Sequence, residues 1–288
     1  MRRPGLTQWL MLAPAQVLLW ATIGLPAVFV LWLSFNQSTY GSSDRFVGFA
    51  NYVAIWKDPY FWRATINTLI VIHIVIYTEI VLATIMAVAF SGLKRHRLLV
   101  SIILMPYAIS EVVAVIIWKF LMDANVGAVE RSLVALGLPP MYWASDPTSG
   151  LALISIVSIW RNLPFSFMLI FAAVLAVPRQ LYEAASVDGA SAWARFRYVT
   201  LPGIMPTVAV ALVFRYIIAF RIFTEVWLLT GGGPARRTEV LALYLYKQAF
   251  SYSQFGVGAA TGWVMVVVSL LFGIGYIWML RIRGEVSV

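Results

Sequence analysis

Six long apolar segments constrain the fold of this chain more than any other feature of its sequence. Each is long enough to cross the ~30 Å hydrocarbon core of a bilayer as a helix, which takes about 20 residues. They lie at 9–34, 66–90, 98–122, 150–176, 204–224 and 259–280. Only helices and closed barrels satisfy their backbone hydrogen bonds inside lipid. The sequence therefore predicts an all-α, polytopic membrane protein, with residues 1–288 forming a single transmembrane domain.

Composition argues against a soluble protein and against a nucleic-acid partner. The chain is 61% hydrophobic and 11% charged, whereas soluble domains carry about 45–50% apolar and about 25% charged residues. Its net charge of +9 fits Lys and Arg held on the cytoplasmic side of a membrane protein. With no cysteine and only two distant histidines, His73 and His96, we expect no metal site.

Positive charge in the short loops predicts the orientation of the chain. One short turn between the second and third spans contains three basic residues, Lys94, Arg95 and Arg97. Short loops rich in Lys and Arg stay in the cytoplasm. Both termini are then expected to be cytoplasmic, and so is the loop at 179–202 between the fourth and fifth spans.

That loop is the longest segment between two spans that is both mixed in polarity and predicted to be helical, and its residues favour two short helices. Gly189 permits a break between them. Ser191 is a suitable N-cap for the second helix. Trp193, Phe196 and Val199 follow at a spacing that gives roughly one apolar stripe.

The same loop resembles the cytoplasmic coupling loop of ABC importer permeases. The family pattern is E-A-A, three residues, Gly, nine residues, Ile, one residue, Leu-Pro, and Val199 stands here for the Ile. The resemblance implies that this loop contacts an ATPase subunit. The coupling residues it assigns are Glu183, Ala184, Ala185, Asp188, Gly189, Leu201 and Pro202.

Further segments extend the resemblance to the carbohydrate, maltose-permease-like members of that family. They lie in the family's order at 46–52, 61–69, 105–110, 159–165 and 229–234. Residues 214–223 are also close to the permeases of trehalose and other disaccharide importers. The resemblance implies the type I ABC importer permease fold in a bacterial or archaeal cytoplasmic membrane, surrounded by membrane lipid.

The resemblance also implies partners and a substrate. A second homologous permease completes a heterodimer, two cytoplasmic ATPase subunits bind ATP and Mg²⁺, and an extracytoplasmic binding lipoprotein delivers a sugar such as trehalose or maltose. This chain has no G-x-x-x-x-G-K-[ST] motif of its own, so it is expected to bind no cofactor and to be no enzyme.

Ionisable residues inside a bilayer are costly and by default suggest a function. Those within or at the edges of the predicted spans are Glu79, Glu111, Lys119, Arg161, Arg215, Arg221 and Glu225. Lys119 and Glu225 lie near enough to a span end to reach the interface. Arginine offers five donors, so the three arginines suit either a solute or a salt bridge with Glu79 or Glu111.

The family's substrate path, carried over by motif, falls on the fourth and fifth predicted spans. The assigned residues are Ser158, Trp160, Arg161, Asn162, Phe165, Arg215, Ile218 and Ala219. Trp160 and Phe165 offer flat faces that sugar rings favour. Most of these side chains differ from those of the maltose permease, so the geometry of the path transfers and its specificity does not.

Several alternatives remain open at this stage. A polyol, an amino sugar or a glycerol phosphodiester fits the same frame, and the arginines also suit an anion. A stand-alone secondary transporter needs a coupling acid, for which Glu79 is the candidate, and repeats that the sequence does not display. An intramembrane enzyme lacks the motifs H-E-x-x-H and G-x-S-x-G.

Two glycine patterns lie between the last two predicted spans and at the start of the last span. The run Gly231-Gly232-Gly233-Pro234 is either a helix stop or a flexible outer lip where a delivering protein docks. Gly258 and Gly262 have the spacing of close helix packing, either within the bundle or with a second permease.

Overall fold

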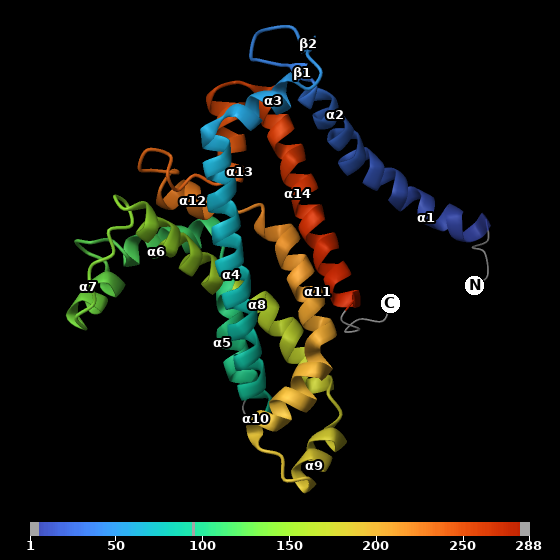
Figure 1. Ribbon diagram of the computed structural model, residues 1–288, viewed down its shortest axis with the longest axis vertical. Helices are drawn as coiled ribbons and strands as arrows, with labels where there is room; N and C mark the ends of the chain where they lie inside the picture. The colour runs from blue at the N-terminus through green and yellow to red at the C-terminus, as the bar shows by residue number, and fades with distance from the viewer. Residues whose placement is uncertain (1–5, 94–95, 283–288) are drawn as a thin grey trace. The chain divides into compact units, whose positions relative to one another are not determined.

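The computed structural model describes residues 6–93 and 96–282, which are mostly helical (Figure 1). Lys94 and Arg95, on which the predicted orientation partly depends, lie outside the described residues. The chain divides into two units. The first comprises the residues up to Phe61 together with Tyr244–Val266, and the second comprises Trp62–Leu243 together with the residues after Val266.

The α-helices are α1 Leu6–Leu19, α2 Leu25–Ser34, α3 Ala50–Lys57, α4 Pro59–Ser91, α5 His96–Ala108, α6 Glu111–Leu121, α7 Ala128–Ala135, α8 Pro147–Ala176, α9 Arg179–Val187, α10 Ala192–Arg195, α11 Leu201–Ala219, α12 Thr224–Leu229, α13 Leu241–Tyr246 and α14 Phe255–Ile282. Three π-helical turns are η1 Trp20–Gly24, η2 Phe196–Thr200 and η3 Lys247–Ser251. A short antiparallel pair joins β1 Asn36–Gln37 to β2 Arg45–Phe46.

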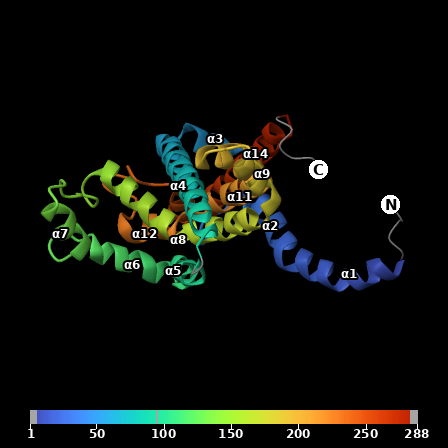
Figure 2. The same ribbon diagram turned by 90° about the horizontal axis from the view of Figure 1, so that it is seen from below.

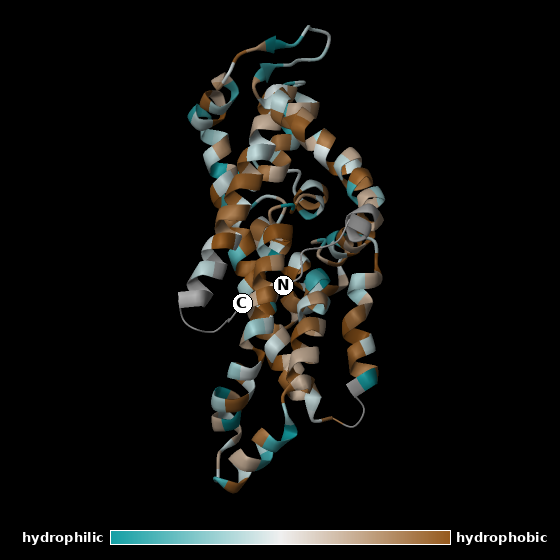
Figure 3. Cartoon of the chain, turned by 90° about the vertical axis from the view of Figure 1, so that its right-hand side faces the viewer, coloured by the Kyte–Doolittle hydropathy of each residue, from teal (hydrophilic) through white to brown (hydrophobic). Residues whose placement is uncertain are grey.

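Of the described helical segments, five are long and apolar enough to cross a membrane by themselves. They are Met11–Ser34, Pro59–Ser91, Pro147–Ala176, Ala192–Ala219 and Phe255–Gly275. Figure 3 shows hydrophobic residues along the long helices. The remaining predicted span, 98–122, is a pair of helices, and counting that pair as one span gives the predicted six.

That pair bends sharply, which the sequence analysis did not predict. Its two helices, Arg97–Ala108 and Glu111–Leu121, meet at 98°. Pro106 lies inside the last turn of α5, and Ser110 has the extended ψ of 136° immediately before α6. Proline removes a helical hydrogen bond, which weakens the turn and lets the chain change direction within two residues.

The fifth span also differs from its predicted bounds of 204–224. It begins at Ala192 and ends at Ala219, so the second half of the predicted loop belongs to a continuous helix. The π-helical turn η2 directly precedes Leu201-Pro202. Because proline has no N–H, a wider turn accommodates it without ending the helix.

The hydrophobic core of the second unit lies between α4, α8 and α11. Ile76 and Ala83 of α4, Phe167 of α8, and Ala211 and Leu212 of α11 are fully or almost fully buried in one cluster. Small alanines let the helices approach closely, which favours tight packing in the absence of a hydrophobic driving force in lipid.

Asp146 caps the start of α8. Its carboxylate accepts hydrogen bonds from the backbone N and the Oγ of Ser149, each at 2.7 Å. These bonds favour the ionised form and hold the pKa of the Asp146 carboxyl below its usual range. The cap and Pro147 at the first position together fix where α8 begins.

Two asparagines of the family-like segments have structural roles. In the first unit, Asn51 donates from its amide to Ser34 O and Asn36 O, at 2.8 and 2.9 Å. In the second unit, Asn67 donates to Arg237 O and Glu239 O, both at 2.8 Å. Each amide satisfies buried carbonyls of irregular backbone, which would be costly to leave unpaired.

The predicted glycine packing is confirmed within the chain. A Cβ at Gly258 would lie 2.8 Å from the Cβ of Ala249, and one at Gly262 would lie 3.3 Å from Leu245. The start of α14 therefore packs closely against α13 and η3 of the first unit. The run of three glycines follows the end of α12, with Gly231 and Gly232 at positive φ, as expected of a helix stop.

Candidate functional site

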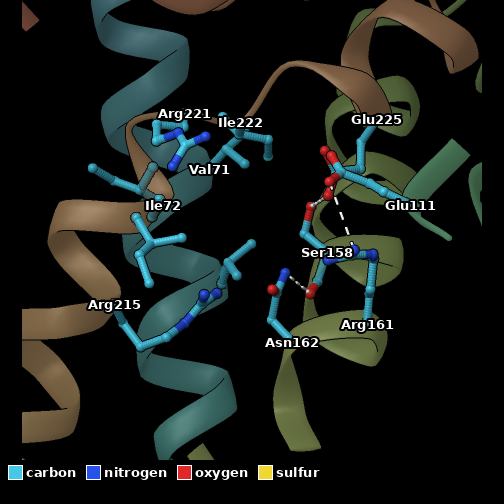
Figure 4. A pocket seen from close by; sticks show the side chains of 13 residues that line it. Val71, Ile72, Glu111, Ser158, Arg161, Asn162, Arg215, Arg221, Ile222 and Glu225 are labelled. Atoms are coloured by element: carbon cyan, nitrogen blue, oxygen red, sulfur yellow. Dashed lines mark hydrogen bonds and ion pairs between the residues drawn. The ribbon is translucent and has the colours of Figure 1, made fainter. Parts of the chain in front are cut away.

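A cavity of about 240 Å³ lies inside the second unit, between α4, α6, α8, α11 and the loop that leads into α12. Figure 4 shows its side chains converging from these elements. Its apolar lining comes from aliphatic residues of α4, of α11 and of the turn after α11. They are Val71, Ile72, Val75, Ile218, Ala219 and Ile222.

Six of the eight residues predicted for the substrate path line this cavity. They are Ser158, Arg161, Asn162, Arg215, Ile218 and Ala219. Trp160 and Phe165, the two predicted aromatic faces, are not among the described lining residues. The ring of Trp160 instead packs edge-on against Trp118 of α6, with 5.8 Å between centroids. The helical register of α8 thus directs the indole to a neighbouring helix.

Three cavity residues were singled out as ionisable but not assigned to the path: Glu111, Arg221 and Glu225. Their signal in the sequence was charge beside or within an apolar span. That signal does not reveal which charged residues line the same cavity. Glu111 comes from α6, Glu225 from α12 and Arg221 from the turn between α11 and α12.

Arg215 forms a buried ion pair with Glu79, deep in the second unit. Its Nε and its second terminal nitrogen approach Oε2 of Glu79 at 3.0 and 2.8 Å. Ser166 Oγ donates to the other carboxylate oxygen. Side-chain exposure is 4% for Arg215 and 0% for Glu79. The sequence analysis offered a salt bridge with Glu79 or Glu111 as the alternative role of the arginines, and for Arg215 the salt bridge with Glu79 is confirmed.

Arg161 lies close to two acidic residues, Glu111 and Glu225, and among the described residues it forms only a long ion pair with Glu111. Its guanidinium is 3.7 Å from Oε2 of Glu111, and its Nε is buried without a partner among the described residues. Glu225 is 4% exposed. One of its oxygens accepts from Ser158 Oγ at 3.2 Å, and the other has no partner in the described part of the chain. Figure 4 shows these polar groups on one wall.

Lys119, expected to reach the interface, has a specific partner. Its Nζ donates to the backbone carbonyl of Leu228 at 2.7 Å, which links α6 to α12. This contact helps to hold in place the two short helices whose first turns carry Glu111 and Glu225.

The second candidate site is the predicted coupling loop, whose two short helices form as expected. α9 ends in an αL glycine cap: Gly189 has a φ of 73°, its N–H donates to Ser186 O, and Ala190 N–H donates to Ala185 O. Ser191 caps α10 by accepting from Ala194 N at 3.2 Å. Figure 1 shows α9 and α10 at the end of the second unit where α4 ends and α5 begins, and Figure 2 shows α9 viewed from below.

Large apolar side chains on this segment are exposed. Val187 is 88% exposed, Trp193 69% and Tyr198 77%. Among the described residues, Glu183 is paired with Arg179 alone, one turn earlier at 3.0 Å, and both side chains are largely exposed. We call the segment Arg179–Pro202 the elbow. Exposed apolar side chains of this kind are typical of a contact with another protein or with a membrane.

Among the residues the structure describes, no group of three His, Asp or Glu side chains could hold a metal ion. The candidate sites are therefore the polar cavity and the elbow. Both belong to the second unit, and α11 takes part in both.

Comparisons with known proteins agree on one family. Residues 79–283 match the family described as "Binding-protein-dependent transport system inner membrane component". The sulfoquinovosyl glycerol transport system permease SmoG of Agrobacterium fabrum is 34% identical, over 95% of this chain and 90% of that protein. The trehalose/maltose transport system permease MalF of Thermococcus litoralis is 31% identical, over 96% of this chain and 94% of that protein.

Solved structures show the same fold. A chain of a bacterial alginate ABC transporter, in complex with an alginate pentasaccharide-bound periplasmic protein, superposes with a TM-score of 0.85. It is 23% identical, and the alignment covers 97% of this chain and 96% of that one. The similarity confirms the predicted all-α type I ABC importer permease fold.

Proposed function

The chain belongs to the family of binding-protein-dependent transport system inner membrane components, and we propose that it is one permease subunit of an ATP-driven sugar importer. In this role it forms half of a translocation path, with a second homologous permease as the other half. An extracytoplasmic binding lipoprotein delivers the sugar. Both termini then lie on the cytoplasmic side of a bacterial or archaeal cytoplasmic membrane.

The observation that carries the proposal is the exposed elbow. Two cytoplasmic ATPase subunits, which hold ATP and Mg²⁺, drive the cycle, and one of them receives the elbow in a groove. Glu183 lies beside the exposed apolar side chains and is free to change its partner, because its pair with Arg179 is on the surface and weak. The coupling role of Glu183, Ala184, Ala185, Asp188, Gly189, Leu201 and Pro202 is part of this proposal.

The cavity is the proposed sugar site of this subunit, with Ser158, Arg161, Asn162, Arg215, Ile218 and Ala219 along the path. Relatives named for trehalose/maltose and for sulfoquinovosyl glycerol support a sugar, and the solutes in their names differ. A disaccharide such as trehalose or maltose therefore stays a prediction. The arginines of the cavity favour the alternative of an anionic solute.

Replacing Gly189 with Val tests the coupling role. Valine disfavours the left-handed backbone that Gly189 adopts at φ 73°, at a cost of about 1–2 kcal/mol. A Cβ there meets nothing within 4 Å, so the effect comes from the backbone. If the elbow must keep its present angle to dock, the ATPase subunits should bind about tenfold more weakly, since 1.4 kcal/mol is tenfold. The measurement is their retention on tagged chain in the purified complex.

Gly137→Val is the matched control for this experiment. Gly137 ends α7 with the same cap, a φ of 83° and hydrogen bonds from Gly137 N to Val134 O and from Leu138 N to Leu133 O. A Cβ there also meets nothing within 4 Å. Valine at position 137 causes the same backbone strain outside the elbow. This control variant should therefore retain the ATPase subunits as well as the wild type does. Equal retention by both variants would reject the coupling role.

A further inference from the structure

The charge of the transported solute can be inferred from the cavity, on the premise that the cavity is the sugar site proposed above. Three arginines line it, but they are not equivalent. Arg215 is already neutralised by Glu79 through two contacts of 3.0 and 2.8 Å. A buried and fully paired guanidinium of this kind serves packing, so Arg215 supplies little free positive charge to a solute.

Arg221 is the arginine with charge to offer. Its side chain is exposed, and none of the ion pairs among the described residues includes it. Figure 4 shows it on the α11 side of the cavity, opposite Glu225 and Glu111. A guanidinium presents paired donors that match the two oxygens of a carboxylate or the oxygens of a sulfonate.

The opposite wall offers acceptors. Glu111 keeps 40% of its side chain exposed and is held by Arg161 only at 3.7 Å. Asn162 donates from Nδ2 to Ser158 O at 2.8 Å, which leaves its Oδ1 without a partner among the described residues. Carboxylate and amide oxygens of this kind accept hydrogen bonds from hydroxyl groups. The cavity thus has Arg221 on one side, and carboxylate and amide acceptors together with Arg161 on the other.

The remaining lining limits the way in which a solute is recognised. Among its described lining residues there is no aromatic ring to stack on a neutral sugar face, and Trp160 packs on Trp118 instead. Recognition at this wall of the path therefore depends on polar groups.

We propose that this cavity binds an acidic sugar, with its anionic group on Arg221 and its hydroxyls donating to Glu111 and Asn162. A neutral sugar of the same size satisfies the acceptor wall equally well. It offers no anionic group to the Arg221 guanidinium, which has no ion-pair partner among the described residues. The anionic group therefore accounts for the one arginine of the cavity that the described chain does not neutralise.

The test compares two sugars that differ only at C6, D-galacturonate and D-galactose. Binding is measured on the full-length chain in nanodiscs. The wild type should bind galacturonate at least about tenfold more tightly than galactose, because hydrogen bonds to charged groups contribute about 1.5–3 kcal/mol. In Arg221→Gln the preference should disappear, and in Arg221→Lys, which keeps the charge, most of it should return.

Arg131→Gln is the control, since Arg131 is an exposed arginine of α7 outside the cavity, and it should keep the full preference. Unchanged unfolding curves show that the variants are folded. Equal affinity for the two sugars, or binding of neither, overturns the inference about charge. Neither result affects the ATPase-retention experiment at Gly189, so failure of this inference and failure of the proposed function are distinguishable.

Discussion

Replacing Glu79 with Ala is expected to lower the free energy of unfolding by about 3–5 kcal/mol, the usual cost of removing one partner of a buried ion pair. The substitution leaves Arg215 charged, 4% exposed and without the carboxylate that it contacts at 2.8 Å. It also removes the acceptor of Ser166 Oγ. The measurement is unfolding of the purified chain by SDS in mixed micelles.

The double variant Glu79→Leu/Arg215→Met distinguishes pair energetics from simple loss of packing. Replacing both partners of a buried pair with apolar residues is often neutral or stabilising, so the double variant should recover most of the loss. Glu183→Ala is the control, because its pair with Arg179 is largely exposed and contributes little. A double variant as unstable as Glu79→Ala would contradict this explanation.

Gly256→Ala is expected to destabilise the first unit by at least about 1–3 kcal/mol, the usual cost of overpacking. A Cβ at this position would lie 2.1 Å from Asn36 O and 2.8 Å from Nδ2 of Asn51. The backbone of Asn36 has no side-chain freedom with which to yield. The hydrogen bond from Asn51 to Asn36 O, now 2.9 Å long, should also break.

Gly275→Ala is the matched control, in the same helix α14. A Cβ at Gly275 meets nothing within 4 Å. Alanine there should leave stability unchanged or raise it by about 0.5–1 kcal/mol, because glycine is the more costly residue in a helix. Thermal unfolding of the two variants checks the prediction, which fails if Gly256→Ala unfolds at the wild-type temperature.

Features set by local chemistry could be predicted from the sequence. The elbow is an example: a glycine that caps one helix, Ser191 that caps the next, and Leu201-Pro202 entering a span are signals within about twenty residues. The apolar spans are equally local, since length and hydropathy alone identify them. Most of the residues predicted for the path line one cavity, because the family motif fixes their register on α8 and α11.

Features set by long-range packing could not be predicted. Glu79 and Arg215 are 136 residues apart in the sequence. Their opposite charges made them possible partners, but Glu111 was an equally possible partner of Arg215. The family motif assigned Trp160 to the path, yet its indole packs on Trp118 of another helix. The 98° bend was missed because hydropathy continues through it, although Pro106 and Ser110 mark the place.

The bend between α5 and α6 also determines how deeply the cavity lies. The 13 residues of α5 rise about 20 Å at 1.5 Å per residue. Set along the bilayer normal, α5 reaches about two thirds of the way through the ~30 Å core. In that setting α6, turned by 98°, would run close to the membrane plane. Glu111 at its start would then lie inside the hydrocarbon core, about 10 Å from the opposite edge.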